Sequence, residues 1–135
     1  MSKFVILTLA SALLFCAFSG MAIAGEINWL TSMSDGITLA KSSGKPIMVD
    51  FYTDWCGWCK KLDKDTYTNS TVQALAEKFV CVKVDADKDR ASAEKYGVSG
   101  FPTIIFLDKD GKEIDRITGY EGPEAFAETM KKIVK

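Results

Sequence analysis

Two cysteines separated by two residues, Cys56 and Cys59, are the feature of this sequence whose chemistry is easiest to specify. They follow an apolar run over residues 47–52 and begin a segment with helical spacing, so we expect them where a strand turns into a helix. The N–H groups and positive dipole at a helix N-terminus stabilise a thiolate, the reactive form of cysteine. Cys59, one turn further on, lies on the same helix face and can close a disulfide. The spacing predicts a redox dithiol with a nucleophile and a resolving thiol.

Two other interpretations of this pair are weaker. A CxxC pair is also half of a zinc ribbon, but the sequence has no histidine, and the remaining cysteines, Cys16 and Cys81, are single and distant. No second ligand pair exists, and we expect no metal site. A purely structural disulfide does not account for the position at a helix start.

Asp50 is the second residue with unexpected chemistry, because it lies inside the otherwise apolar run 47–52. Such a run is typical of a central strand that is buried on both faces. A carboxylate there is costly unless it is paired or protonated. A buried acid with a raised pKa can accept a proton near neutral pH, so Asp50 is a candidate for proton transfer.

Composition limits the remaining possibilities. The chain has 135 residues, of which 47% are hydrophobic and 26% charged, which fits one compact domain. The formal net charge is −1, without the clustered basic residues of a nucleic-acid-binding surface. We therefore expect no nucleic-acid partner.

The N-terminus has the pattern of a secretory signal peptide over residues 1–24. Lys3 begins it, an apolar run over residues 4–18 follows, and Ala22-Ile23-Ala24 forms a cleavage site. The run is shorter than the roughly 18 residues that a membrane-spanning helix needs, which argues against the alternative of an uncleaved anchor. We expect a periplasmic or otherwise exported protein, soluble after cleavage, whose mature domain covers residues 25–135.

Cys81 is the odd cysteine of the mature domain, since Cys16 belongs to the predicted signal. It lies in the strand-like run 79–85, where a small buried thiol is common and unreactive. We expect it to be inert rather than regulatory.

The remaining pattern predicts an α/β domain, a central mixed sheet flanked by helices. We expect Ser34 or Asp35 to cap the first helix and a capping box from Ser70 to Gln73 to open the helix after the dithiol helix. The expected elements are a helix ending near Gly44, a strand over 47–52, a helix from the dithiol that breaks at 66–69, a helix from Ser70, a strand over 79–85, a short helix over 91–96, strands over 103–107 and 112–118 joined by a hairpin, and a last helix from Pro123.

Several short segments together resemble thioredoxin, from about Lys45 to Val134. The resemblance implies a thioredoxin fold, with Cys56 as the exposed nucleophile and Cys59 as the buried resolving thiol. The segments that carry it are Val49-Asp50-Phe51-Tyr52, Trp55-Cys56-Gly57-Trp58-Cys59-Lys60, Lys83, Lys95-Tyr96-Gly97-Val98-Ser99-Gly100-Phe101-Pro102-Thr103, and Gly119.

The resemblance also implies roles for residues outside the CxxC pair. Pro102 matches the family's cis-proline beside the dithiol, and the backbone of Phe101 would pair with an extended substrate segment. Asp50 would lie beneath Cys59 and take its proton, with Lys83 facing the carboxylate; a purely structural ion pair is the alternative. Trp55, Gly57 and Trp58 would contact a docked substrate.

Two departures from thioredoxin refine the resemblance. Gly57-Trp58 stands where the family most often has Gly-Pro, and the helix after Cys59 breaks at residues 66–69 instead of kinking at a proline. Because of the first departure, the family's redox potential cannot be carried over. The second, together with Gly44-Lys45-Pro46 and Asp54-Trp55-Cys56, is more similar to the C-terminal domain of DsbD-type reductases.

The resemblance implies an exported thiol:disulfide oxidoreductase, a protein-disulfide reductase that exchanges disulfides with substrate proteins. A membrane thiol reductase would supply its electrons, no cofactor beyond the Cys56–Cys59 disulfide would be needed, and the protein would be a monomer. One alternative is a binding module in which the dithiol holds a soft metal such as Cu(I) or serves one acceptor such as an apocytochrome. Another is an oxidase or isomerase, because the sequence does not fix the reduction potential.

Overall fold

The structure, a computed structural model, describes residues 25–135. The predicted signal peptide of residues 1–24 lies outside the described residues. Among the helices of residues 25–135, none is both long enough and apolar enough to cross a membrane.

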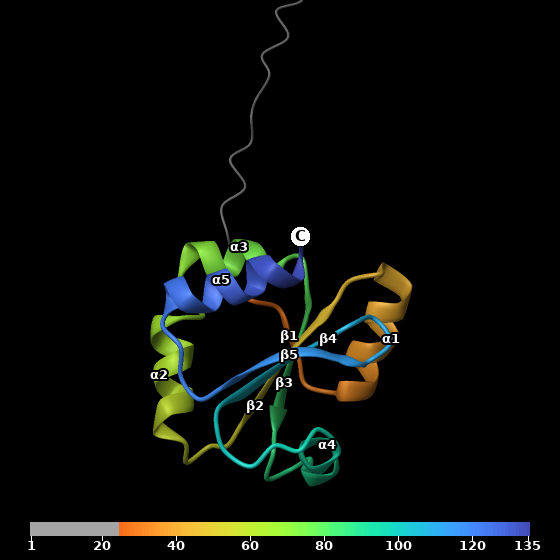
Figure 1. The fold of residues 1–135 in the computed structure, drawn as a ribbon. Coiled ribbons are helices and arrows are strands. Elements are labelled where there is room, and N and C mark those ends of the chain that lie inside the picture. Colours follow the sequence, from red (N-terminus) through yellow and green to blue (C-terminus); the bar gives the residue numbers. More distant parts are fainter. Residues whose placement is uncertain (1–24) are drawn as a thin grey trace, which may run out of the picture.

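The described chain contains five strands and five helices (Figure 1). The mixed sheet flanked by helices that the sequence predicts is confirmed. In chain order the elements are β1 (Trp29–Leu30), α1 (Met33–Ser43), β2 (Ile47–Tyr52), α2 (Gly57–Asp65), α3 (Ser70–Ala76), β3 (Val80–Asp85), α4 (Arg90–Lys95), β4 (Thr103–Leu107), β5 (Glu113–Thr118) and α5 (Pro123–Ile133).

The strand order in the sheet is β1-β3-β2-β4-β5. The pairs β1–β3 and β2–β3 are parallel, whereas β2–β4 and β4–β5 are antiparallel. The hairpin predicted from Asp108 to Gly111 therefore joins β4 to β5 as expected. The strand β2 lies at the centre of the sheet, which explains its nearly continuous apolar sequence.

Helices cover both faces of the sheet. Figure 1 shows α2, α3 and α5 gathered on one side of the strands and α1 on the other, and the buried side chains divide in the same way. One core includes Leu62 of α2, Val72 of α3 and Phe126 of α5. The other includes Ala40 of α1 and Ala93 of α4. Because side chains alternate along a strand, Met48 of β2 belongs to the first core, whereas Ile47, Val49 and Phe51 belong to the second.

Three local features differ from the sequence predictions. The N-cap of α1 is Ser32, not Ser34 or Asp35, and the N-cap of α3 is Asn69, whose side chain accepts hydrogen bonds from two backbone N–H groups. The capping box predicted from Ser70 is therefore wrong; Gln73 instead donates to the carbonyl of Tyr67. The strand β1 was not predicted, because two residues are too short to give a period.

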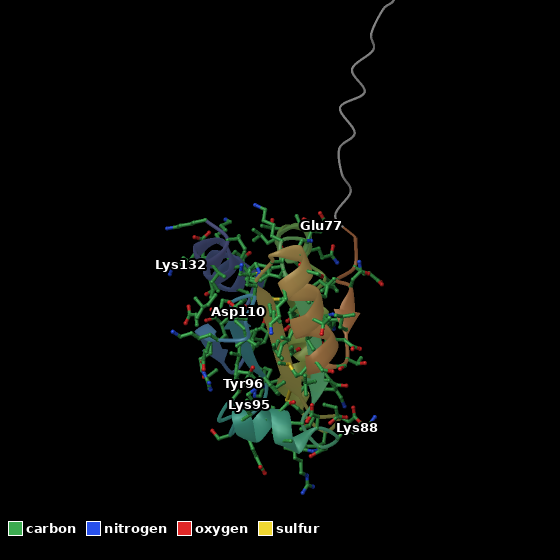
Figure 2. The ribbon with its side chains drawn as sticks, turned by 90° about the vertical axis from the view of Figure 1, so that its right-hand side faces the viewer. Glu77, Lys88, Lys95, Tyr96, Asp110 and Lys132 are labelled. Carbon is green, nitrogen blue, oxygen red and sulfur yellow. A yellow bond between two sulfur atoms is a disulfide. The ribbon has the colours of Figure 1, made fainter. Side chains whose placement is uncertain are left out.

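The carboxyl ends of the parallel strands β2 and β3 lie at one edge of the sheet. Figure 2 shows Lys88, which follows β3, and Lys95 of α4 at one end of the molecule, and Glu77 at the C-terminus of α3 at the other. The helix α2 begins shortly after β2, so the CxxC pair belongs to the same end as Lys88 and Lys95.

Candidate active site

Cys56 and Cys59 form a disulfide at the start of α2, with their Cα atoms 5.3 Å apart. Cys56 is the N-cap residue of this helix, and its Sγ accepts a hydrogen bond from the backbone N–H of Cys59 at 3.1 Å. The same N–H groups that hold the Cys56 sulfur here would stabilise its thiolate after reduction.

The two cysteines are covered to nearly the same extent. Cys56 is 5% exposed and Cys59 is 3% exposed in the disulfide form. The expectation of an exposed Cys56 is therefore wrong for this form. The difference between the two sulfurs lies in their surroundings: Cys56 caps the helix, whereas Cys59 lies inside its first turn.

Two tryptophans border the disulfide, and both are exposed, Trp55 at 71% and Trp58 at 59%. Trp55 Nε1 donates to Asp87 Oδ2 at 3.0 Å, which fixes the indole over the loop after β3. The ring of Trp58 lies 5.6 Å from that of Tyr120, centre to centre. The exposed Gly57, the first residue of α2, leaves the backbone between these rings uncovered.

Phe101 and Pro102 lie some 45 positions after the dithiol in the sequence. Phe101 nevertheless contacts Trp55, the residue directly before Cys56. The rings of Trp55 and Phe101 meet edge to face, with centroids 6.1 Å apart. The peptide bond between Phe101 and Pro102 is cis. The structure thus brings Phe101, next to the cis bond to Pro102, against Trp55, which directly precedes Cys56 in the sequence.

Asp50 is completely buried in β2 and faces the α2 side of the sheet. In the parallel register it lies directly opposite Lys83 of β3, and Lys83 Nζ is 3.2 Å from Asp50 Oδ2. Burial raises the pKa of Asp50 above its ordinary value, although Lys83 opposes this. The carboxyl can therefore hold a proton at a higher pH than an exposed aspartate.

Lys83 also forms an ion pair with Asp63 of α2. Burial opposes the charge on Lys83, but Asp50 and Asp63 together raise its pKa above the ordinary value. Asp63 lies four residues after Cys59 and so shares its helix face. The ammonium of Lys83 therefore connects the buried carboxylate of β2 to the Cys59 face of α2.

Sequence reasoning missed Asp63, Asp87, Tyr67 and Tyr120. The spacing of Asp63 from Cys59 was a signal that could have found it, since four residues separate neighbours on a helix face. For Asp87, Tyr67 and Tyr120 the contacts cross between elements, and no local spacing identifies them.

Cys81 lies in β3 and is 5% exposed. Burial raises the pKa of the Cys81 thiol to about 12. Because only the thiolate is nucleophilic, Cys81 is unreactive at neutral pH, in agreement with the sequence-based expectation.

Comparison with known proteins places this arrangement among thiol–disulfide proteins. The model of the thioredoxin-like domain family matches residues 33–133. The thiol:disulfide interchange protein DsbD of Cronobacter sakazakii is 39% identical over 95 residues, which are 66% of this chain and 17% of that protein. The chain thus spans less than a fifth of the length of this curated relative.

Two solved structures have a similar fold. A thioredoxin from Thermus thermophilus aligns with a TM-score of 0.73 and 24% identity over 82% of this chain and 88% of that one. A structure described as DsbH oxidoreductase aligns with a TM-score of 0.74 and 21% identity over 99% of this chain and 94% of that one. At these identities the two structures support the fold alone.

Proposed function

This chain belongs to the thioredoxin-like domain family, and we propose that it is a thiol:disulfide oxidoreductase that works outside the cytoplasm as a reductase of protein disulfides. The observation that carries the proposal is the position of the Cys56–Cys59 disulfide. It caps α2 between two exposed tryptophans, and the buried Asp50 is linked to the same helix through Lys83, which pairs with both Asp50 and Asp63.

The reaction follows from the two thiols of the reduced form. The Cys56 thiolate attacks one sulfur of a substrate disulfide, which forms a mixed disulfide and releases one substrate sulfur as thiolate. The Cys59 thiolate then attacks Cys56 Sγ, closes the Cys56–Cys59 disulfide and releases the second substrate thiolate. The substrate gains two electrons and the dithiol loses two, so the proposal needs no cofactor beyond the disulfide itself.

Asp50 has the proton-accepting role in this proposal. Cys59 must lose its proton before it attacks, and a buried carboxylate with a raised pKa can take it. Lys83 balances the charge of that carboxylate at 3.2 Å. The ion pair with Asp63 keeps Lys83 in place on the side of α2 that carries Cys59.

The substrate would bind as an extended segment across the exposed aromatic surface around the disulfide. The backbone of Phe101, before the cis bond to Pro102, would pair with the main chain of the substrate. Trp55 and Trp58 would exclude water from the sulfurs, and Gly57 would allow close approach. Recognition of backbone in this way permits many different protein substrates.

The direction and the electron donor are inferred by analogy. The similarity to DsbD supports a reducing role, in which a membrane thiol reductase returns electrons to the Cys56–Cys59 disulfide. An exported reductase needs such a donor because its compartment has no reducing thiol buffer. We propose that the protein acts there as a monomer after removal of residues 1–24.

The test is thiol trapping in intact cells with an alkylating reagent, followed by mass spectrometry of the protein. We expect a mature N-terminus near Gly25, and Cys56 and Cys59 mainly reduced, becoming oxidised when the membrane donor is deleted. In the same cells Cys59→Ser should accumulate mixed disulfides with substrate proteins, whereas Cys56→Ser, the matched control, should not.

A different result would contradict each part of the proposal. A dithiol that is mainly oxidised while the donor is intact would make the protein an oxidase or isomerase. Equal trapping by both serine variants would overturn the assigned order of the two thiols. An intact N-terminus at Met1 would contradict export by signal cleavage.

A further inference from the structure

Tyr67 is a buried tyrosine whose hydroxyl group has no assigned role. It lies between α2 and α3 and is 6% exposed. Its ring packs edge to face against Trp29, with centroids 4.9 Å apart, and against Phe126, at 5.7 Å. Its hydroxyl oxygen is buried without a hydrogen-bond partner among the described residues. An unpaired buried hydroxyl destabilises the fold, so its retention needs a reason.

Asp50 also has an unpaired buried oxygen, one that can accept a hydrogen bond. Its Oδ2 is paired with Lys83, but its Oδ1 is buried and also lacks a hydrogen-bond partner among the described residues. A carboxylate oxygen can only accept, and a phenol can donate. The two buried groups therefore have matching chemistry.

Lys83 shows that the two groups are neighbours. Its Nζ lies 3.2 Å from Asp50 Oδ2 and 5.2 Å from the centre of the Tyr67 ring. The charge of Asp50 contributes, after burial, to raising the pKa of Tyr67. Because the pKa of Tyr67 is raised well above its ordinary value, the phenol stays protonated and remains a donor.

We propose that Tyr67 is a positioning residue that donates a hydrogen bond to Asp50 Oδ1 and so keeps this buried carboxyl available as a base. A hydrogen bond to a charged acceptor is stronger than one to a neutral acceptor, so the bond favours the ionised carboxylate. The inference deepens the proposed function: its structural part concerns Asp50 alone, and its kinetic consequence rests on the proton-accepting role of Asp50.

Tyr67 does not itself transfer a proton in this scheme. The Cys59 thiol gives its proton to the Asp50 carboxylate, and the resulting Cys59 thiolate attacks Cys56 Sγ in the mixed disulfide. The bond between Cys56 and the substrate breaks, the substrate leaves as a thiolate, and Asp50 later returns the proton to that thiolate or to water. The charged groups that face Asp50 are Lys83 from β3, which favours its ionised form, and Asp63 from α2, which opposes it.

The first test measures Asp50 directly. Tyr67→Phe removes only the hydroxyl oxygen and keeps the ring, and the matched control is Tyr52→Phe. The ring of Tyr52 lies 5.1 Å from Lys83 Nζ, but its hydroxyl has no direct part in the shift of Asp50. The titration of the Asp50 carboxyl carbon is followed by NMR in the disulfide form, in which neither Cys56 nor Cys59 titrates.

We expect Tyr67→Phe to move the midpoint of the Asp50 titration upward by about one pH unit, because a charge-assisted hydrogen bond is lost. Tyr52→Phe should leave the midpoint in place. An unchanged midpoint in Tyr67→Phe, or an equal shift in both variants, would overturn the inference.

The second measurement separates this inference from the proposed function. The rate at which Cys59 resolves a mixed disulfide is measured against pH in wild type and Tyr67→Phe. We expect the midpoint of the rate profile to rise with that of Asp50, with full rate recovered at higher pH. A shifted Asp50 titration with an unshifted rate profile would support the Tyr67 contact and overturn the catalytic role of Asp50 instead.

Discussion

At the scale of single residues, the site depends on a carboxyl group in an unfavourable place. Asp50 is completely buried in the central strand, and the one charged partner of its side chain within residues 25–135 is Lys83. Burial outweighs this ion pair, because the net effect raises the pKa of Asp50. The fold therefore tolerates a group that weakens it at neutral pH, which is typical of functional residues.

This imbalance predicts the effect of Asp50→Asn on stability. A carboxyl with a raised folded-state pKa stabilises the fold below its unfolded pKa, and this contribution is lost as the pH rises through the folded-state pKa. At pH 7 the free energy of unfolding of Asp50→Asn should therefore be about 1 kcal/mol higher than that of wild type, so the variant is more stable. The difference should shrink as the pH falls toward 3.8, the ordinary pKa. Urea unfolding across this pH range measures it.

Asp65→Asn provides the control for this prediction. In wild type, the hydrogen bond with Lys61 lowers the pKa of Asp65. The pH dependence of the stability difference therefore has the opposite sign: Asp65→Asn should lose stability relative to wild type as the pH rises above the ordinary carboxyl pKa. If Asp50→Asn is less stable than wild type at pH 7, the ion pair with Lys83 outweighs burial. If its disulfide-exchange rate also keeps the wild-type pH profile, the role of Asp50 is structural.

At the scale of elements, the helix break after α2 places the residues of the site. The backbone leaves α2 at Thr66, whose hydroxyl donates to the carbonyl of Glu121 at 2.7 Å, and α3 starts after Asn69. This break directs Tyr67 inward, between the rings of Trp29 and Phe126. The start of α3 thus fixes the segment that carries the Tyr67 hydroxyl.

We expect Asn69→Ala to lower the free energy of unfolding by about 1 kcal/mol, because the Asn69 side chain accepts from the N–H groups of Thr71 and Val72. Ser70→Ala is the control: Ser70 is exposed and inside the helix, so this change should be nearly neutral. Urea unfolding of both variants measures the two changes in the free energy of unfolding. A larger loss in Ser70→Ala would restore the capping box that the sequence suggested.

At the scale of the whole molecule, two cores on the two faces of one sheet hold the dithiol end together. Cys81 belongs to the core beneath α3 and α5 and donates to the carbonyl of Ala76 through its sulfur. Its thiol reports on the opening of this core, because neither its exposure nor its pKa allows reaction in the folded state.

In the disulfide form of the mature protein, we expect Cys81 to react with an alkylating reagent only through global unfolding. The labelling rate at neutral pH should therefore rise with urea concentration as steeply as the equilibrium constant for unfolding does. Cys81→Ala should take up no label. Labelling that is fast and insensitive to urea would instead reveal local opening, with the short edge strand β1 moving away from β3.

The local features could be predicted from the sequence: the CxxC pair at a helix start, the buried central strand with its one acid, the β4–β5 hairpin and the helix that begins at Pro123. Each of these is encoded by neighbouring residues, through spacing, turn chemistry or hydrophobic period. The same local rules failed for the caps of α1 and α3, where more than one polar residue could accept the same N–H groups.

The surroundings of the reacting groups depend on contacts between segments that are distant in the sequence. The pairing of Asp50 with Lys83 requires the register of β2 against β3, and the contact between Trp55 and Phe101 joins segments far apart in the sequence. The role proposed for the unpaired hydroxyl of Tyr67 depends on its position near Asp50. Such contacts follow from how the strands align and the helices pack, which no local pattern of residues specifies.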